Sequence, residues 1–386
     1  MTNEIDYSTK VLESLVDLLD IPDSYYELAK SRYESLGEWF HRPDSTVIKY
    51  DPAIYPQGSF RLGTVIRPIT WPEEYDLDLV CQLRLEKGRM SQKTLKETVG
   101  REVKEYALKY SFKESPEEKP RCWRLNYADS VNFHLDILPA IPVDADTRNA
   151  IVANGVHPRF TDLAVLITDR ASISYELLNK DWPCSNPRGF ALWFETKVRT
   201  VTSARINALI EKRLYASVDD VPTYAWKSPL QKAVQVLKRH RDVMFSEDPG
   251  GKPISMIITT LSAQAYHGEM DLMGAITNII DGMLNGVGGA PPYIPNPVNP
   301  TEDFADKWRA KPQLRDNFYM WCGRIKEDIS LLTSTQDQRQ LKSQFSNKFK
   351  CDLSEAKLQE LLPQGKADIG RTAPFVKIKT DQKPWS

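Results

Sequence analysis

The sequence predicts an α+β fold with two lobes, in which a sheet domain follows a long N-terminal helix and packs on a mainly helical second lobe. Short β-rich runs with one helical segment between them occupy residues 45–140, which is typical of a sheet covered by helices. Beyond about residue 191 the apolar residues recur mainly at helical spacing. The 386 residues are enough for two packed lobes. We expect a helical spine at 1–44, a sheet core at 45–190 and a helical lobe at 191–386.

The expected elements follow in chain order. From about Ser8 to Trp39 the apolar spacing predicts one long helix, or two helices joined near Ile21 and Pro22. In the core we expect strands at 46–50, 74–83, 122–127, 131–141, 150–154 and 175–179, and a helix at 93–110. In the second lobe we expect helices at 191–213, 228–246, 254–266, 270–284, 302–333, 335–348 and 353–363. The Gly- and Pro-rich segment 286–300 predicts a long irregular loop, and the tail after Ala367 a strand or a surface segment.

The composition excludes several classes of protein. A formal net charge of −1 gives no global positive field, which argues against a nucleic-acid polymer as partner but leaves a small nucleotide possible. The five cysteines are scattered and the five histidines do not join them at metal-ligand spacing, so neither a disulfide framework nor a zinc site is predicted. The polar N-terminus is unlike a signal peptide, and no apolar run approaches the roughly 20 residues of a membrane span. We expect a cytoplasmic protein without membrane contact.

Two carboxylates share one face of a predicted strand. In the run EYDLDLV, side chains alternate, so Asp76 and Asp78 point the same way while Leu77 points to the other face. Adjacent carboxylates repel and raise each other's pKa unless a cation lies between them. Hard oxygen ligands suit Mg²⁺ or Mn²⁺. A half-exposed strand with two solvated acids is the alternative.

Two further features flank this strand in the chain. In QGSFRLGT, Gly58 allows the backbone to approach a phosphate closely and Ser59 adds a hydroxyl donor, although Gly-Ser is also a common turn signal. Asp136 lies in the apolar run VNFHLDILPA, where an acid is unfavourable unless it is paired or metal-bound. A structural salt bridge is the alternative for Asp136.

The order Gly-Ser, Asp-Leu-Asp and a later lone Asp resembles the polymerase-β-like nucleotidyltransferase superfamily. The motifs QGSFRLGTVIRP, YDLDLV and HLDILPAIP resemble those of the bacterial cGAS/DncV-like nucleotidyltransferases (CD-NTases), which are the cyclic-oligonucleotide synthases of antiphage (CBASS) signalling. Within this family, the motifs favour a clade G-like member. The resemblance spans most of the chain. One departure is the longer gap between Ser59 and Asp76.

The resemblance implies a role for each residue of the site. Asp76 and Asp78 would hold two Mg²⁺ or Mn²⁺ ions, and Asp136 would complete one metal site and help to deprotonate the attacking hydroxyl. The triphosphate would be bound by Gly58 and Ser59 together with Gln57, Arg61, Lys238 and Ser255. Arg61 could instead pair with Glu73 or Glu74, and Ser255 could be an ordinary helix cap. Met256 stands where the animal enzyme has a base-stacking aromatic residue.

The resemblance also implies an activity. The chain would join nucleoside triphosphates, with purines favoured, into a cyclic di- or trinucleotide and release pyrophosphate, without a nucleic-acid ligand and with regulatory or effector proteins encoded nearby. The alternatives are a template-independent transferase that makes linear oligonucleotides or extends RNA, and a silent scaffold or antitoxin. A patch of Lys and Arg between residues 109 and 124 would serve an RNA substrate.

Overall fold

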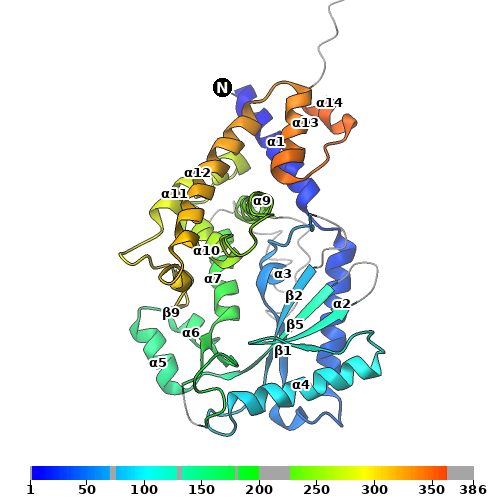
Figure 1. The fold of residues 1–386 in the computed structure, drawn as a ribbon, viewed down its shortest axis with the longest axis vertical. Coiled ribbons are helices and arrows are strands. Elements are labelled where there is room, and N and C mark those ends of the chain that lie inside the picture. The colour runs from blue at the N-terminus through cyan, green and yellow to red at the C-terminus, as the bar shows by residue number, and fades with distance from the viewer. Residues whose placement is uncertain (1, 70–74, 128–132, 179–180, 200–226, 363–386) are drawn as a thin grey trace, which may run out of the picture.

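The computed structural model describes residues 2–69, 75–127, 133–178, 181–199 and 227–362. The chain forms a sheet lobe and a helical lobe, drawn at the bottom and the top of Figure 1. The N-terminal segment forms two helices, α1 (Thr2–Leu19) and α2 (Asp23–His41), with the break at the expected place. Helix α1 packs among the helices of the upper lobe, whereas α2 lies beside the sheet. The N-terminal segment therefore connects both lobes.

A mixed sheet forms the core of the lower lobe. Its strands run in the order β1-β2-β5-β4-β3, and β6 pairs with β5 and with β7. Their bounds are β1 (Ala53–Pro56), β2 (Tyr75–Gln82), β3 (Glu117–Glu118), β4 (Trp123–Tyr127), β5 (Phe133–Pro142), β6 (Val165–Ile167) and β7 (Cys184–Ser185). Strands β2 and β5 are parallel neighbours along the whole of β2, and β1 and β4 flank them antiparallel. The central pair is thus fixed by hydrogen bonds on both sides.

The two faces of the central strands differ in chemistry. Leu77 and Leu79 of β2 and Leu135 of β5 are fully buried in one apolar core, which also includes residues of α2 and of α4 (Gln92–Lys109). Because side chains alternate along a strand, the acidic residues of β2 and β5 point to the opposite face. Burial of the leucine face therefore fixes which way the acids point.

The upper lobe is helical. It comprises α7 (Pro187–Arg199), α9 (Pro229–Met244), α10 (Ser255–Ala265), α11 (Leu272–Asn285), α12 (Pro312–Ser334), α13 (Gln338–Phe349) and α14 (Glu355–Leu361). A short ribbon of β8 (Pro295–Asn296) and β9 (Asn299–Asp303) follows α11. Within the described ranges no helix has the length and apolar character needed to span a bilayer.

Helix α9 holds the two lobes together through polar side chains. It donates hydrogen bonds to backbone carbonyls of residues 62–67, which follow the short helix α3 (Gly58–Leu62). The donors are Gln231 to Leu62 at 2.9 Å, Gln235 to Val65 at 2.7 Å, Lys238 to Thr64 at 2.8 Å, and Arg239 to Arg67. Since Leu62, Thr64 and Val65 are buried, each of the bonds to these three carbonyls removes the penalty of an unpaired acceptor. The segment behind α3 is thereby fixed to the helical lobe.

Several expected strands are different elements in the structure. Residues 46–50 turn into a 3-10 helix (Ile48–Tyr50), because the Glu102 carboxylate accepts from both the backbone N–H and the hydroxyl of Thr46. Residues 150–154 belong to helix α5 (Ala145–Ala153), which Asp144 caps by accepting from Thr147 N–H at 2.7 Å. Residues 175–178 form a turn. The segment 286–300 contains part of the β8–β9 ribbon.

Other boundaries differ from the expected ones. The helix expected at 302–333 begins only at Pro312, after a 3-10 turn at Asp306–Trp308. A four-residue helix, α6 (Pro158–Thr161), was not expected. Residues 200–213 of one expected helix and the C-terminal tail lie outside the described residues.

Candidate active site

The register of the central strands brings two predicted acids together. Asp78 on β2 lies opposite Asp136 on β5, and Asp76 lies opposite His134. These side chains share the face that points away from the leucine core. Asp76 is exposed at the rim, whereas Asp78 and Asp136 are half-buried. Residues 58 positions apart in the chain therefore form one acidic site.

Arg124 on β4 is the counter-ion of this acidic site. It lies opposite Asp136 in the register and binds its carboxylate through two hydrogen bonds, from Nε and from Nη2, each of 2.7 Å. Nη2 also lies 3.5 Å from Oδ1 of Asp76. Hydrogen bonding to Asp136 raises the pKa of Arg124 above its ordinary value. The salt bridge considered for Asp136 thus exists, and its partner is a residue that the sequence placed only in a basic patch.

The environment of Asp78 and Asp76 favours the neutral forms of these two acids. Burial raises the pKa of Asp78 to about 7, and the negative charges of Asp76 and Asp136 add to this shift. Desolvation raises the pKa of Asp76 too, although Arg124 opposes it. Among the described residues, no three His, Cys, Asp or Glu side chains converge closely enough to hold one metal ion.

The Gly-Ser element lies directly beside these acids. Gln57 caps the start of α3, and its backbone N–H donates to the carbonyl of Asp78 at 2.8 Å. Gly58 has a φ of +67°, and a Cβ atom there would lie 2.3 Å from Oδ2 of Asp78. Only glycine fits both the backbone conformation and the space. The Ser59 hydroxyl is half-buried next to it, with no hydrogen bond to any described residue.

Lys238 approaches the site from α9. It is buried, and its Nζ donates to the carbonyl of Thr64 at 2.8 Å. Burial, and then the neighbouring Arg241, lower the pKa of Lys238 to about 8, whereas the acids Asp78 and Asp76 oppose the shift. An ammonium group has three donors, so two remain after the bond to Thr64. A cation is therefore available close to the acids.

The other two predicted ligands of the triphosphate have protein partners. Arg61 pairs with Glu195 of α7 at 2.6 Å, a partner that the sequence did not indicate; Glu73 and Glu74 lie outside the described residues. Arg241 donates to the Ser255 hydroxyl at 3.0 Å. The cap of α10 is the residue before Ser255 and makes no side-chain hydrogen bond, so the ordinary-cap interpretation of Ser255 is wrong.

His134 lies on the acidic face of β5, opposite Asp76. Its Nδ1 lies 2.7 Å from the amide oxygen of Asn126, and the Asn126 amide donates to Glu114 at 2.7 Å. The ring is thus connected through Asn126 of β4 to the segment that precedes β3.

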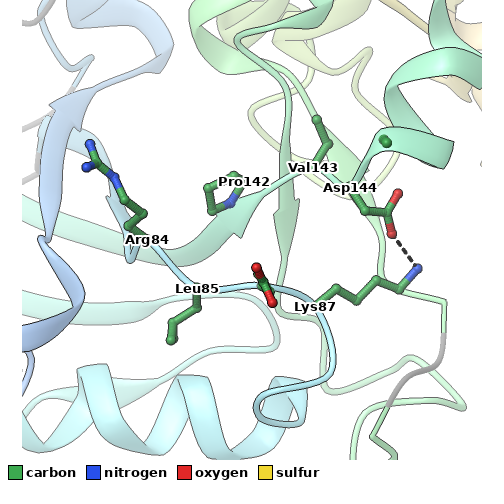
Figure 2. A pocket seen from close by; sticks show the side chains of 8 residues that line it. Arg84, Leu85, Lys87, Pro142, Val143 and Asp144 are labelled. Carbon is green, nitrogen blue, oxygen red and sulfur yellow. Dashed lines mark ion pairs between the residues drawn. The ribbon is translucent and has the colours of Figure 1, made fainter.

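Among the cavities that the described residues line, two lie near the sheet, and one of these adjoins the acids. A cavity of about 240 Å³ is lined by Gly58 and Asp78 and by residues of the helical lobe. A larger one of about 730 Å³ lies at the carboxyl ends of β2 and β5. Figure 2 shows that an ion pair between Lys87 and Asp144, of 3.0 Å, lies at its edge. None of the predicted site residues lines this second cavity.

Comparison with known proteins assigns the chain to a family. Residues 52–139 match the sequence model described as the nucleotidyltransferase domain of cyclic GMP-AMP synthase DncV-like proteins. The chain is 30% identical to the c-di-GMP synthase of Roseivirga ehrenbergii over 321 residues, which cover 82% of this chain and 77% of that protein. The chain belongs to the DncV-like nucleotidyltransferase family. It is therefore an enzyme of the nucleotidyltransferase class.

Two further comparisons extend to most of the chain. The cyclic dinucleotide synthase CdnG of Bradyrhizobium diazoefficiens is 24% identical over 326 residues, 80% of this chain and 72% of that protein. The solved structure of the same CdnG in complex with GTP superposes with a TM-score of 0.64 and 20% identity, covering 92% of this chain and 98% of that one. The DncV-like fold thus includes the helical lobe as well as the matched nucleotidyltransferase domain.

Gly58→Ala tests the close approach of α3 to the acids. The added methyl group must displace Asp78 or the backbone, and the positive φ adds about 1–2 kcal/mol of strain. We expect nucleotidyl transfer to fall about 100-fold, because small displacements of reacting groups have effects of this size. Gly37→Ala in α2 is the control, since a Cβ atom there meets nothing within 4 Å. Steady-state rates and unfolding temperatures give the activity and the stability of both variants. A Gly58→Ala enzyme with wild-type activity would contradict the close approach of α3 to Asp78.

Asp78→Asn tests the electrostatic strain. A folded-state pKa of about 7, above the 3.8 of the free side chain, means that metal-free protein loses stability as pH rises from about 4 to 7. The pKa shift limits the stability lost over this pH range to about 4 kcal/mol, and contact of Asp78 with solvent reduces this limit to about half. We expect Asp78→Asn to lose less stability over this range. Urea unfolding with a chelator at pH 5 and pH 7.5 measures the difference, and parallel pH profiles would refute it.

Proposed function

We propose that this enzyme joins nucleoside triphosphates into a cyclic dinucleotide, with release of pyrophosphate. The observation that carries the proposal is the in-register placement of Asp78 beside Asp136, with Gly58 in contact range of Asp78. A triphosphate bound at Gly58 and Ser59 would have its α-phosphorus next to these carboxylates. Positioning and charge neutralisation are the main sources of rate in phosphoryl transfer.

The acidic residues fit two divalent cations, which we propose to be Mg²⁺ or Mn²⁺. The donor atoms are carboxylate oxygens on neighbouring strands, the ligand type that these ions prefer. Burial and the charges of Asp76 and Asp136 raise the pKa of Asp78 even with Arg124 present, so a bound cation would favour the ionised form of this carboxylate. Asp76 and Asp78 would hold both ions, and Asp136 would complete one site after Arg124 releases it. Bound ions of this kind stabilise the attacking and leaving oxygens of an in-line displacement.

The protein's own side chains have separate tasks in this mechanism. Asp136, once Arg124 has released it, would help to deprotonate the attacking sugar hydroxyl. Ser59 and the free donors of Lys238 bind the β- and γ-phosphates, whose negative charge restores the pKa of the buried lysine. Ser255 and Arg61 adjoin this triphosphate site, each held by its own partner.

The relatives support a cyclic purine product. One is named a c-di-GMP synthase and the other a cyclic dinucleotide synthase, and the solved structure of the latter contains GTP. Cyclisation requires the site to catalyse two transfers, and the linear intermediate must be reoriented in the site between them. We place the activity in the cytoplasm, where nucleoside triphosphates are available, and assign the product to antiphage signalling through effector proteins encoded nearby.

The product of the purified enzyme tests the proposal. With Mg²⁺ or Mn²⁺ and a mixture of GTP and ATP, we expect a nucleotide that resists phosphatase and has the mass of a cyclic dinucleotide. Asp136→Asn removes the proton acceptor, so the rate should fall by about 10²–10⁴-fold. Asp316→Asn is the matched control, because that side chain is 62% exposed on α12.

Mass spectrometry of the phosphatase-treated reaction distinguishes the alternatives. A ladder that phosphatase degrades would show a linear polymerase instead. Nucleotide binding without any product would show a scaffold, and either result would overturn cyclic dinucleotide synthesis.

A further inference from the structure

The cavity beside the acids has walls from both lobes. Gly58 and Asp78 form its catalytic side, and Asn296, Glu302 and Phe304 of the β8–β9 region form part of the opposite side. Its volume of about 240 Å³ is below the roughly 300–1,000 Å³ of sites for drug-sized ligands. A triphosphate bound at α3 would direct its nucleoside into this space. The size and the place suit one nucleobase.

Apolar side chains line part of the cavity. Phe304 and Phe190 contact each other edge to face, with ring centroids 6.5 Å apart. Met256 lines the cavity from α10. An aromatic ring and a thioether offer the apolar contact that a flat base requires. Phe304 thus supplies an aromatic group to the cavity in which Met256 replaces the expected stacking residue.

Besides Asp78, one further carboxylate lines the cavity, that of Glu302. Glu302 accepts a hydrogen bond from the Asn296 amide at Oε2, over 2.7 Å. Its other oxygen has no partner among the residues that the structure describes. Burial raises the pKa of Glu302, which is the expected effect on an acid removed from water. One acceptor in a confined site is therefore available to a ligand.

The surrounding hydrogen bonds hold Glu302 in place. Asn296 is 3% exposed, and its oxygen accepts from the N–H of Val298 at 3.0 Å. The Asn299 amide donates to the carbonyl of Cys184 in β7 at 3.1 Å, and the Asn186 amide donates to that of Val298 at 3.0 Å. The turn of the ribbon and the start of β9 are thus tied to β7 and to the residue that follows it. Such support is what a specificity-determining residue requires.

We propose that Glu302, positioned by Asn296, reads a guanine base in this cavity. A carboxylate only accepts hydrogen bonds, and guanine offers two adjacent donors, N1–H and the N2 amino group, on its Watson–Crick edge. Adenine places an acceptor at N1, which a carboxylate repels. Charge-assisted pairs are the stronger hydrogen bonds, so the discrimination is large. The inference rests on the proposed function, because it assigns the cavity to the nucleotide substrate.

Binding of non-hydrolysable triphosphate analogues tests the inference without any need for turnover. For the wild-type enzyme with Mg²⁺ we expect the guanosine analogue to bind about 5- to 150-fold more tightly than the adenosine analogue. In Glu302→Gln the amide offers a donor as well as an acceptor, so the ratio should approach one. Asn296→Ala removes the hydrogen bond that positions the Glu302 carboxylate. It should therefore lower the ratio of the two affinities by a smaller factor than Glu302→Gln does. Calorimetric titration gives each affinity.

The controls separate base reading from folding and from catalysis. Glu327→Gln, whose side chain is 71% exposed on α12, should keep the wild-type ratio. The inosine analogue lacks the N2 amino group, so the wild-type enzyme alone should bind it about 10-fold more weakly than the guanosine analogue. An unchanged ratio in folded Glu302→Gln, or equal binding of the inosine and guanosine analogues, would overturn the assignment. Because these are binding measurements, failure to form a cyclic product would leave their outcome interpretable.

Discussion

The parallel pairing of β2 with β5 is the constraint on which the rest of the site depends. It sets Asp78 directly opposite Asp136. The buried leucines that alternate with these acids along the two strands fix the face to which both acids point. A shift of one residue would move every side chain of the strand to the other face. The apolar core therefore holds two like charges together against their repulsion, which adds to the effect of burial in raising the pKa of Asp78. Arg124 relieves part of it from β4.

The helical lobe supplies the other half of the site. Helix α9 fixes the segment behind α3 through donors to its carbonyls, and one of them, Lys238, keeps donors for a phosphate. The β8–β9 ribbon brings Glu302 to the cavity next to Asp78. Asp78 from the sheet and Glu302 from the ribbon thus line one cavity, and Lys238 of α9 interacts electrostatically with Asp78. The proposed roles draw on both lobes, with the acids and Ser59 from the sheet lobe and with Lys238 and Glu302 from the helical lobe.

The sequence predicted best what depends on local pattern. Alternation along β2 placed Asp76 and Asp78 on one face, and the apolar run around Asp136 marked a second strand. The strand pairing that joins them depends on tertiary contacts and could not be obtained from one sequence. Arg124 alternates with the buried Trp123 and Leu125, so its face could be predicted, but its opposition to Asp136 could not. Glu195 and Glu302 reach the site from distant segments, and no local signal marks them. The strands expected at 46–50 and 150–154 failed because Glu102 and Asp144 bind the backbone there, and such side-chain bonds override propensity.

Competition between Arg124 and a divalent cation for Asp136 offers the most direct test of the acidic site. Mn²⁺ binding to the nucleotide-free enzyme can be followed by electron paramagnetic resonance, in the wild type and in Arg124→Gln. We expect the wild type to bind Mn²⁺ and the variant to bind it about 10-fold more tightly, because a neighbouring charge shifts such equilibria by this order. No binding by the wild type, or weaker binding after removal of the Arg124 charge, would contradict the assignment of these carboxylates to a cation.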